Sequence, residues 1–218
     1  MDKIPPPLDS VDGSELFETV FASDVGVGFS VVDHAGTIRF VNARAAELFL
    51  QTTPEAMLDK SLDEVFDPSW AAERLATFDR IVQTKRPVVM RHIRNGVQLQ
   101  STIRQITEHD GDLALFLIIT IEGESTSADA DAFDVVESEL IDLGPLDPLS
   151  ARELEVLALI GHGMTSKQIA KALHRSVRTV EKHSDAIREK LHSTNRVQVA
   201  DFARKAGLRV EDATKKRL

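Results

Sequence analysis

Four helix starts in the last third of the chain constrain its fold most strongly. Each has a short polar side chain that can accept a hydrogen bond from the first turn of a helix. These side chains belong to Ser150, Thr165, Ser176 and Asn195. Glu153 and Gln168 complete capping boxes at the first two starts. Only a few residues around His174 and Arg175 separate the second predicted helix from the third, and this spacing predicts a helix-turn-helix.

The third predicted helix, from Ser176 to about Leu191, has two different sides. One side is a stripe at helical spacing, which we expect to be buried and which consists of Val180, Ser184, Ile187 and Leu191. The opposite side carries charged residues, namely Arg178, Glu181, Lys182, Asp185 and Arg188. If this helix enters a major groove, its charged side faces the DNA.

The charge of the chain is divided unevenly. The whole sequence has a formal net charge of −9, which on its own argues against a nucleic-acid partner. Residues 149–218, however, hold 15 Lys and Arg against 8 Asp and Glu, a net charge of +7, so the remainder carries −16. This asymmetry favours an acidic domain joined to one that meets a polyanion. A solvated basic tail at Lys215, Lys216 and Arg217 is the alternative, and charge alone does not separate the two.

Residues 149–157, 165–170 and 176–183 resemble the LuxR-type helix-turn-helix family, and the resemblance extends over about 149–208. A sigma-factor DNA-binding domain begins similarly but lacks the Thr-Val-x-x-His run found here. The resemblance implies a bacterial transcription regulator that binds double-stranded DNA. The candidate DNA-contacting residues are Lys167, Ser176, Arg178, Thr179, Glu181, Lys182, His183, Asp185 and Arg188.

The resemblance also implies roles for these residues. Phosphate or groove contacts fall to Lys167, Arg178, Thr179 and His183, and base contacts to Glu181, Lys182 and Asp185. The acids at Glu181 and Asp185 depart from the commoner pattern of the family. A carboxylate can accept a hydrogen bond from cytosine N4, so one hypothesis is that at least one of them selects a cytosine. The alternative is a charge pair along the helix, from Glu181 to Asp185 or Arg188.

The last helix of this family commonly pairs subunits. Here it has an apolar side formed by Val197, Val199, Ala200, Phe202 and Ala203. Some of these residues are also needed for the core of the domain. We expect a homodimer, because one small domain buries little DNA surface and two linked half-sites raise affinity.

The first half of the chain has a mixed pattern. Strands are predicted at 28–32, 37–41, 88–93, 97–106 and 113–122, with a hairpin turn at 33–36. Helices are predicted at 14–21, 43–49, 55–59 and 68–84. The predicted fold class is α+β: an antiparallel five-stranded sheet with helices on one face, followed by an all-α domain of four helices.

Residues 29–42, followed by Ala45 and Ala46, resemble a PAS domain, and the three closing strands fit as well. The resemblance covers 15–123 and implies a sensor with a small cavity for a small-molecule or protein ligand. The alternative is a phosphoacceptor receiver domain, which needs parallel strands and an acidic pair after the first strand. Asp33 follows an apolar run, but it has no acidic neighbour and a hairpin turn comes next.

The candidate pocket residues are Phe40, Asn42, Phe49, Phe66, Trp70, Phe78 and Phe116. Core packing is the alternative role for the aromatic residues, and Asn42 is expected to tie backbone segments together. The chain has no cysteine, which excludes cysteine-based flavin photochemistry. His92 is considered as a haem ligand because His34 and His109 lie in predicted turns. The sequence identifies no cofactor and no metal site.

The predicted organisation is a flexible N-terminus (1–14), the PAS-like domain (15–123), an acidic linker (124–147), the DNA-binding domain (148–208) and a basic tail (209–218). Apolar residues near one face predict a short helix at 133–143 in the linker. The longest apolar run, 113–121, is too short to span a bilayer, and the N-terminus lacks the pattern of a secretory signal. We therefore expect a cytoplasmic protein without a membrane partner.

The sequence contains no P-loop, no metal-ligand spacing and no nucleophile paired with a base, so no catalytic residue is predicted and we expect no enzyme. The leading hypothesis is a transcription regulator whose PAS-like domain modulates DNA binding, through dimer geometry or by masking the basic domain. The alternative is an interaction adaptor that contacts DNA only within a larger complex.

Overall fold

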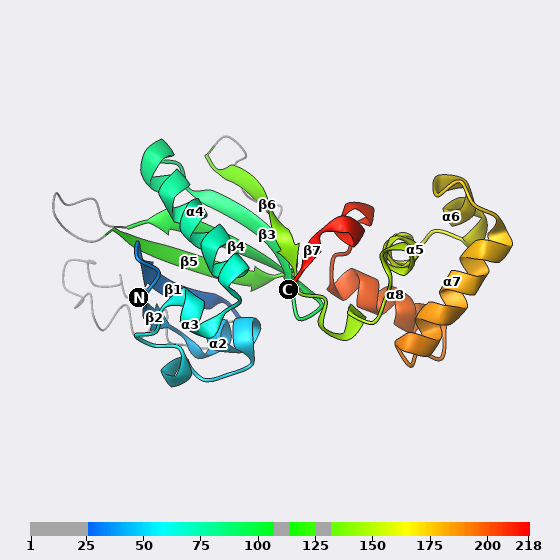
Figure 1. The fold of residues 1–218 in the computed structure, drawn as a ribbon, viewed down its shortest axis with the longest axis horizontal. Coiled ribbons are helices and arrows are strands. Elements are labelled where there is room, and N and C mark those ends of the chain that lie inside the picture. The colour runs from blue at the N-terminus through cyan, green and yellow to red at the C-terminus, as the bar shows by residue number, and fades with distance from the viewer. Residues whose placement is uncertain (1–25, 107–113, 125–131) are drawn as a thin grey trace, which may run out of the picture.

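The computed structural model describes residues 26–106, 114–124 and 132–218. The predicted helix at 14–21 and the predicted turn at 109–112 lie outside these residues. The described chain is elongated, with a helix-covered sheet at one end and a group of helices at the other (Figure 1). None of the described helices combines the length and the apolar composition needed to cross a membrane.

The sheet contains the five predicted strands, β1 (Gly28–Asp33), β2 (Ile38–Val41), β3 (Val88–Arg94), β4 (Val97–Gln105) and β5 (Leu115–Glu122). They pair antiparallel in the order β2-β1-β5-β4-β3, which confirms the predicted α+β class. Two more strands extend the sheet to seven strands in the described part of the chain. β6 (Asp134–Ile141) pairs parallel with β3, and β7 (Lys216–Arg217) pairs parallel with β6, so the sheet is mixed.

Helices cover one face of this sheet (Figure 1). They are α2 (Ala43–Leu50), the 3-10 helix η2 (Pro54–Ala56), α3 (Leu62–Val65) and α4 (Pro68–Thr84). Asp67 caps α4, and Pro68 occupies the first helical position, where its missing N–H costs nothing. The buried residues of α4 are Trp70, Ala71, Arg74, Thr77, Phe78 and Ile81. The arginine in this set places a charge in the buried layer between α4 and the sheet.

The predicted helix at 133–143 is wrong, because residues 134–141 form strand β6. Val136 and Leu140 stand four residues apart, and that spacing fits both the 3.6-residue period of a helix and the two-residue period of a strand. Pairing with β3 decides between them, since the edge of β3 would otherwise present unpaired backbone groups. The segment expected to be a linker is therefore partly built into the sheet.

The last part of the chain forms the four predicted helices, α5 (Ala151–Gly161), α6 (Ser166–Ala172), α7 (Val177–Lys190) and α8 (Arg196–Lys205). All four predicted caps are present: Ser150, Thr165, Ser176 and Asn195 each accept a hydrogen bond from the backbone N–H three residues later. Both predicted capping boxes are also present.

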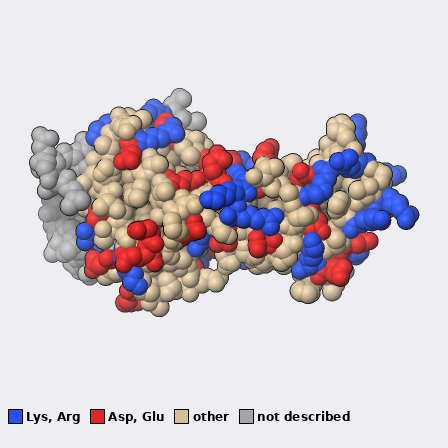
Figure 2. Space-filling model, viewed as in Figure 1, with Lys and Arg blue, Asp and Glu red and all other residues tan. Residues whose placement is uncertain are grey.

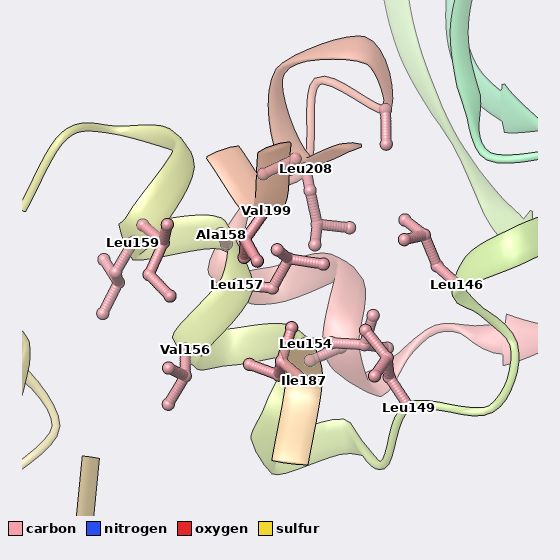
Figure 3. Packing of buried hydrophobic residues seen from close by; sticks show 14 of the residues in the cluster. Leu146, Leu149, Leu154, Val156, Leu157, Ala158, Leu159, Ile187, Val199 and Leu208 are labelled. Atoms are coloured by element: carbon pink, nitrogen blue, oxygen red, sulfur yellow. The ribbon is translucent and has the colours of Figure 1, made fainter. Parts of the chain in front are cut away.

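The core of these helices is centred on α5 (Figure 3). Leu154, Leu157, Ile187 and Val199 are fully buried and come from α5, α7 and α8. The same cluster includes Ile93 of β3 and Ile141 of β6, together with Leu143 and Leu146, the last in the 3-10 helix η3 (Gly144–Leu146). The two halves of the chain therefore share one hydrophobic core at their junction.

Residues 209–218 pack against the sheet and do not form a free tail. The 3-10 helix η4 (Val210–Thr214) buries Asp212 and Ala213, and β7 extends the sheet next to β6. The backbone N–H of Leu218 donates to the carbonyl oxygen of Ile141 at 3.0 Å. Arg209 and Lys215 of this segment pair with Glu137 of β6, and Arg217 donates to the carbonyl oxygen of Leu149. These basic residues therefore contact both domains.

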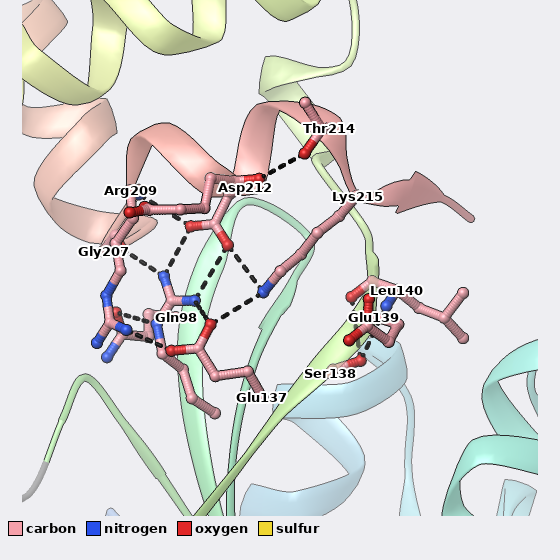
Figure 4. A network of polar contacts seen from close by, with 12 residues as sticks. Gln98, Glu137, Ser138, Glu139, Leu140, Gly207, Arg209, Asp212, Thr214 and Lys215 are labelled. Carbon is pink, nitrogen blue, oxygen red and sulfur yellow. Dashed lines mark hydrogen bonds and ion pairs between the residues drawn. The ribbon is translucent and has the colours of Figure 1, made fainter.

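A polar network around Asp212, Glu137 and Lys215 crosses the junction (Figure 4). Arg91 of β3 makes the most hydrogen bonds to it from the sheet. Its Nη1 and Nη2 donate to Asp212 Oδ1 and Oδ2 at 3.1 and 2.9 Å, and Nη2 also donates to the carbonyl oxygen of Gly207 at 2.6 Å. The Arg91 and Asp212 side chains are only 7% and 1% exposed. Lys215 and Arg209 extend the network to Glu137 on β6. Each charge in this junction therefore has a partner of opposite sign.

Candidate functional site

The charged side of α7 is open to solvent. Arg178, Glu181, Lys182, Asp185 and Arg188 are all exposed, whereas Val180 and Ile187 on the other side are buried. Lys and Arg side chains gather at the end of the molecule formed by α6 and α7 (Figure 2). The sheet lies at the opposite end, so it does not cover this side of α7 (Figure 1).

The N-terminus of α7 is held by its own hydroxyl groups. Ser176 Oγ accepts from the N–H of Thr179 at 3.1 Å and lies 2.8 Å from Thr179 Oγ1. His183 and Thr179 are half-buried, and Lys167 is exposed on α6. The geometry thus gives Ser176 a structural role in starting the helix, in addition to its predicted DNA contact.

The two acidic residues of α7 differ in their partners. Asp185 forms an ion pair with Arg188, one turn further along the helix. Glu181 has no hydrogen bond or ion pair with any described residue, so the charge pair that the alternative requires for Glu181 is not formed. Both acids line a groove of about 220 Å³ between α6, α7 and α8, together with Arg188 and Arg196. The free carboxylate of Glu181 is available to accept a hydrogen bond.

A small cavity of about 30 Å³ lies between the sheet and its helices. Four of the predicted pocket residues line it, namely Phe49, Phe66, Trp70 and Phe78. Phe40, Asn42 and Phe116 do not, and Phe116 instead stacks on Phe78 with 4.3 Å between ring centroids. A volume of 30 Å³ is about the share of one molecule in liquid water. The side chains of the protein itself thus nearly fill this space.

Asn42 ties backbone segments together, as predicted. Its Oδ1 accepts from the N–H groups of Phe29 and Ala45 at 3.0 and 2.8 Å, and its Nδ2 donates to the carbonyl oxygen of Val27 at 3.0 Å. One side chain therefore starts α2 and fixes it to β1.

His92 lies in the core behind the cavity. Its ring stacks on Phe49 with 5.7 Å between centroids, and its Nε2 is 2.9 Å from Ser101 Oγ. Burial, and then the charge of Arg74, hold the pKa of His92 well below its usual range. His92 is therefore neutral near pH 7, and these contacts give it a packing role.

Arg74 is a lining residue that the sequence reading missed. Its guanidinium carbon lies 4.3 Å from the centroid of the Trp70 ring, and its Nη1 pairs with Glu73 at 2.5 Å. Burial lowers its pKa to about 10, against the opposing effect of Glu73, so it stays charged at neutral pH. A signal was present: Arg74 stands four residues from both Trp70 and Phe78, on the buried stripe of α4.

Two family models match the chain. Residues 147–203 match the model of bacterial regulatory proteins of the luxR family, and residues 22–123 match a PAS fold model. The chain joins a PAS domain to a LuxR-type domain. The predicted resemblances are therefore confirmed.

Two relatives of known function match a short part of the chain. The oxygen regulatory protein NreC of Staphylococcus carnosus is 42% identical over 64 residues, covering 29% of this chain and 30% of NreC. The transcriptional regulatory protein LiaR of Bacillus subtilis is 41% identical over 59 residues, covering 27% of this chain and 28% of LiaR. The chain thus spans about three tenths of the length of these relatives.

Among solved structures, a VqmA–ligand–DNA complex from Vibrio cholerae aligns over 94% of both chains, with 19% identity and a TM-score of 0.49. A domain of an HTR-like protein from Haloarcula marismortui aligns with 45% of this chain and 99% of its own length, with 19% identity and a TM-score of 0.40.

The predicted pairing residues of the LuxR-type domain divide into two groups. Val199 and Ala203 are buried in the core of the domain, and Ala200 and Phe202 are half-buried against it. Val197 is 66% exposed and is therefore available to a second subunit. The homodimer stays a prediction.

Proposed function

We propose that the protein is a DNA-binding transcription regulator whose PAS domain senses a signal and modulates DNA binding by the LuxR-type domain. The observation that carries this proposal is the charged side of α7, which is solvent-exposed at the end of the molecule away from the sheet. It stands in a domain of the luxR family that carries a net positive charge. The protein acts by binding and not by catalysis, in the cytoplasm, where bacterial DNA lies.

Lys182 provides the direct test, because an exposed lysine in the groove neutralises phosphate charge or contacts a base. The full chain is first used to select duplexes from a random pool, and its affinity for the selected duplex is then measured at several salt concentrations. We expect specific binding that weakens in Lys182→Gln, with a shallower salt dependence by about one released ion. Lys60→Gln, an exposed lysine of the PAS domain, is the matched control and should bind as the wild type does. No specific binding by the full chain contradicts the proposal, and binding only with a second protein present supports the adaptor function instead.

Glu181 is proposed to read a base, because its exposed carboxylate has no partner among the described residues. Selection from a random pool is repeated with Glu181→Gln, which keeps the size of the side chain and removes the charge. A shifted preference at one base pair, with the loss of a cytosine, is the expected result. An unchanged preference shows that Glu181 does not read bases.

The active form is proposed to be a homodimer in which Val197 of α8 lies between subunits. Sedimentation of the full chain should show a dimer, and Val197→Asp should shift it to the monomer, because a charge is costly in a buried contact. A wild-type chain that stays monomeric when bound to DNA contradicts this part of the proposal.

A further inference from the structure

The cavity of the PAS domain contains one cationic group with an unused donor. The Arg74 side chain is 4% exposed and lines the cavity. Its Nη1 donates to Glu73, and its guanidinium lies over Trp70, but its Nη2 has no hydrogen-bond partner among the described residues. A buried N–H without an acceptor is unfavourable, so this position is suited to an oxygen that the protein itself does not supply.

The other residues that line the cavity indicate that most of the ligand must be apolar. Apart from Ser30 and Ser101, the other lining residues are apolar, among them Val32, Ile38, Leu62 and Ile103. Because the guanidinium stays charged, a carboxylate gives the strongest hydrogen bond to it. The apolar part of the ligand would occupy space that aromatic side chains of the cavity now fill.

We propose that the PAS cavity binds a small apolar carboxylic acid, whose carboxylate accepts from Arg74 Nη2. This inference rests on the proposed sensing function and names the chemical class of its ligand. The occupant needs Phe49 or Phe66 to move, since the cavity of about 30 Å³ holds no more than about one water molecule.

Glu73, the ion-pair partner of Arg74, connects this site to the LuxR-type domain. Glu73 Oε2 accepts from both Arg74 Nη1 and Ser138 Oγ, and Glu73 Oε1 accepts from the N–H of Glu139 at 2.8 Å. Ser138 and Glu139 belong to β6, whose last residue, Ile141, lies in the core shared with the LuxR-type domain. A ligand carboxylate on Nη2 shares the guanidinium with Glu73, the residue that accepts hydrogen bonds from β6. This chain of contacts joins the ligand site to the junction of the two domains.

Trp70 makes the test specific to this cavity. The chain has one tryptophan and no tyrosine, and Trp70 lies beneath the Arg74 guanidinium. The fluorescence of the full chain therefore reports on this site. Benzoate and hexanoate are titrated against their neutral isosteres, benzamide and hexanamide. We expect saturable changes with at least one acid in the millimolar range or below, and at least tenfold weaker binding of its amide. Equal affinity for acid and amide, or no saturable change with either acid, overturns the proposal.

Substitutions then assign the preference to Arg74. Arg74→Gln should remove the preference for the acid, whereas Arg80→Gln, an exposed position on the same helix, should leave it unchanged. If Arg74→Gln does not fold, Glu73→Gln gives the answer, because removing the competing carboxylate should tighten binding of the acid several-fold. A preference retained in Arg74→Gln, or unchanged or weaker binding in Glu73→Gln, contradicts the proposal.

DNA binding by the same proteins distinguishes failure of the ligand proposal from failure of the proposed function. Failure of the acid titration with intact DNA binding contradicts only the ligand assignment. Loss of all specific DNA binding by the wild type contradicts the proposed function, and the fluorescence titration still decides what the cavity holds.

Discussion

Arg91 and Asp212 lie 121 positions apart in the chain, yet their side chains meet in a bidentate pair at the domain junction. Both are almost fully buried, so each has given up its hydration and depends on the other. Nothing in the local sequence marks either residue, since an isolated Arg in a strand or an Asp near the C-terminal end is ordinarily solvated. Arg74 is a different case, because its place on the buried stripe of α4, four residues from Trp70 and from Phe78, could have marked it. Buried charges whose partners are distant in sequence cannot be found from periodicity.

Removing one member of this pair should destabilise the protein strongly. Asp212→Asn leaves the Arg91 charge buried, and we expect a loss of about 3 kcal/mol in the free energy of unfolding. The measurement is urea unfolding of the full chain. Asp201→Asn breaks an exposed pair with Arg204 and should cost less than about 0.5 kcal/mol, because solvent screens it. Equal effects of the two substitutions would show that the junction is not held by this pair.

The same pair should make the free energy of unfolding depend on pH. Burial favours a higher pKa for Asp212, but the hydrogen bonds from Arg91 and the N–H of Arg209 outweigh it and hold the pKa below its ordinary value of about 3.9. The carboxylate therefore stabilises the folded state fully above about pH 4, and this contribution is lost as the pH falls through the lowered pKa. The difference in stability between wild type and Asp212→Asn should accordingly be constant from pH 7 to about 5 and shrink below about 4. A difference independent of pH would contradict this assignment.

At the scale of elements, the sequence was most informative where structure is set locally. The caps of α5 to α8 were predicted correctly because a cap needs only a hydroxyl or amide and the next three residues. Strand β6 was not, because it exists through pairing with β3 and because its inward Ser138 interrupts the apolar alternation. The exposed side of α7 was predicted, whereas the lining of the pocket was predicted only for its four aromatic residues.

The cap of α7 should matter for both stability and DNA binding. Ser176→Ala removes the acceptor for the Thr179 N–H, and we expect a cost of about 1 kcal/mol in unfolding free energy and weaker DNA binding, as the first turn frays. Ser184→Ala is the control on the same helix, because Ser184 Oγ only donates back to the Val180 carbonyl oxygen. Thermal unfolding and DNA titration of both variants check the prediction. A Ser184→Ala variant that is as impaired as Ser176→Ala would exclude capping as the cause.

At the scale of the whole molecule, the two domains share a core and a sheet. Ile93 and Ile141 of the sheet lie in the cluster of the LuxR-type helices, and β7 of the C-terminal segment pairs with β6. Gly207 permits the close approach: a Cβ at this position would lie 1.6 Å from Gln98 Oε1. We therefore expect the domains to unfold together.

Two probes can show whether the domains unfold together, since Trp70 fluorescence reports the PAS domain alone and far-UV circular dichroism reports the helices of both domains. Their thermal transitions should coincide in the wild type and separate in Gly207→Ala, whose methyl group pushes Gln98 away. Gly163→Ala is the control, because Gly163 also has a positive φ, of +77°, but nothing lies within 4 Å of its added Cβ. Separated transitions in the wild type would show that the domains are thermodynamically independent.

The shared core also limits how such a protein can evolve or be engineered. A crossover between chains near residue 145 would leave Ile93, Ile141 and Leu143 facing a foreign surface. It would also separate Arg91 from its carboxylate. A functional chimera would have to transfer these contacts with the domain. Changes on the two sides of the junction are therefore expected to accumulate as matched pairs, so that the PAS domain and the LuxR-type domain are inherited as one unit.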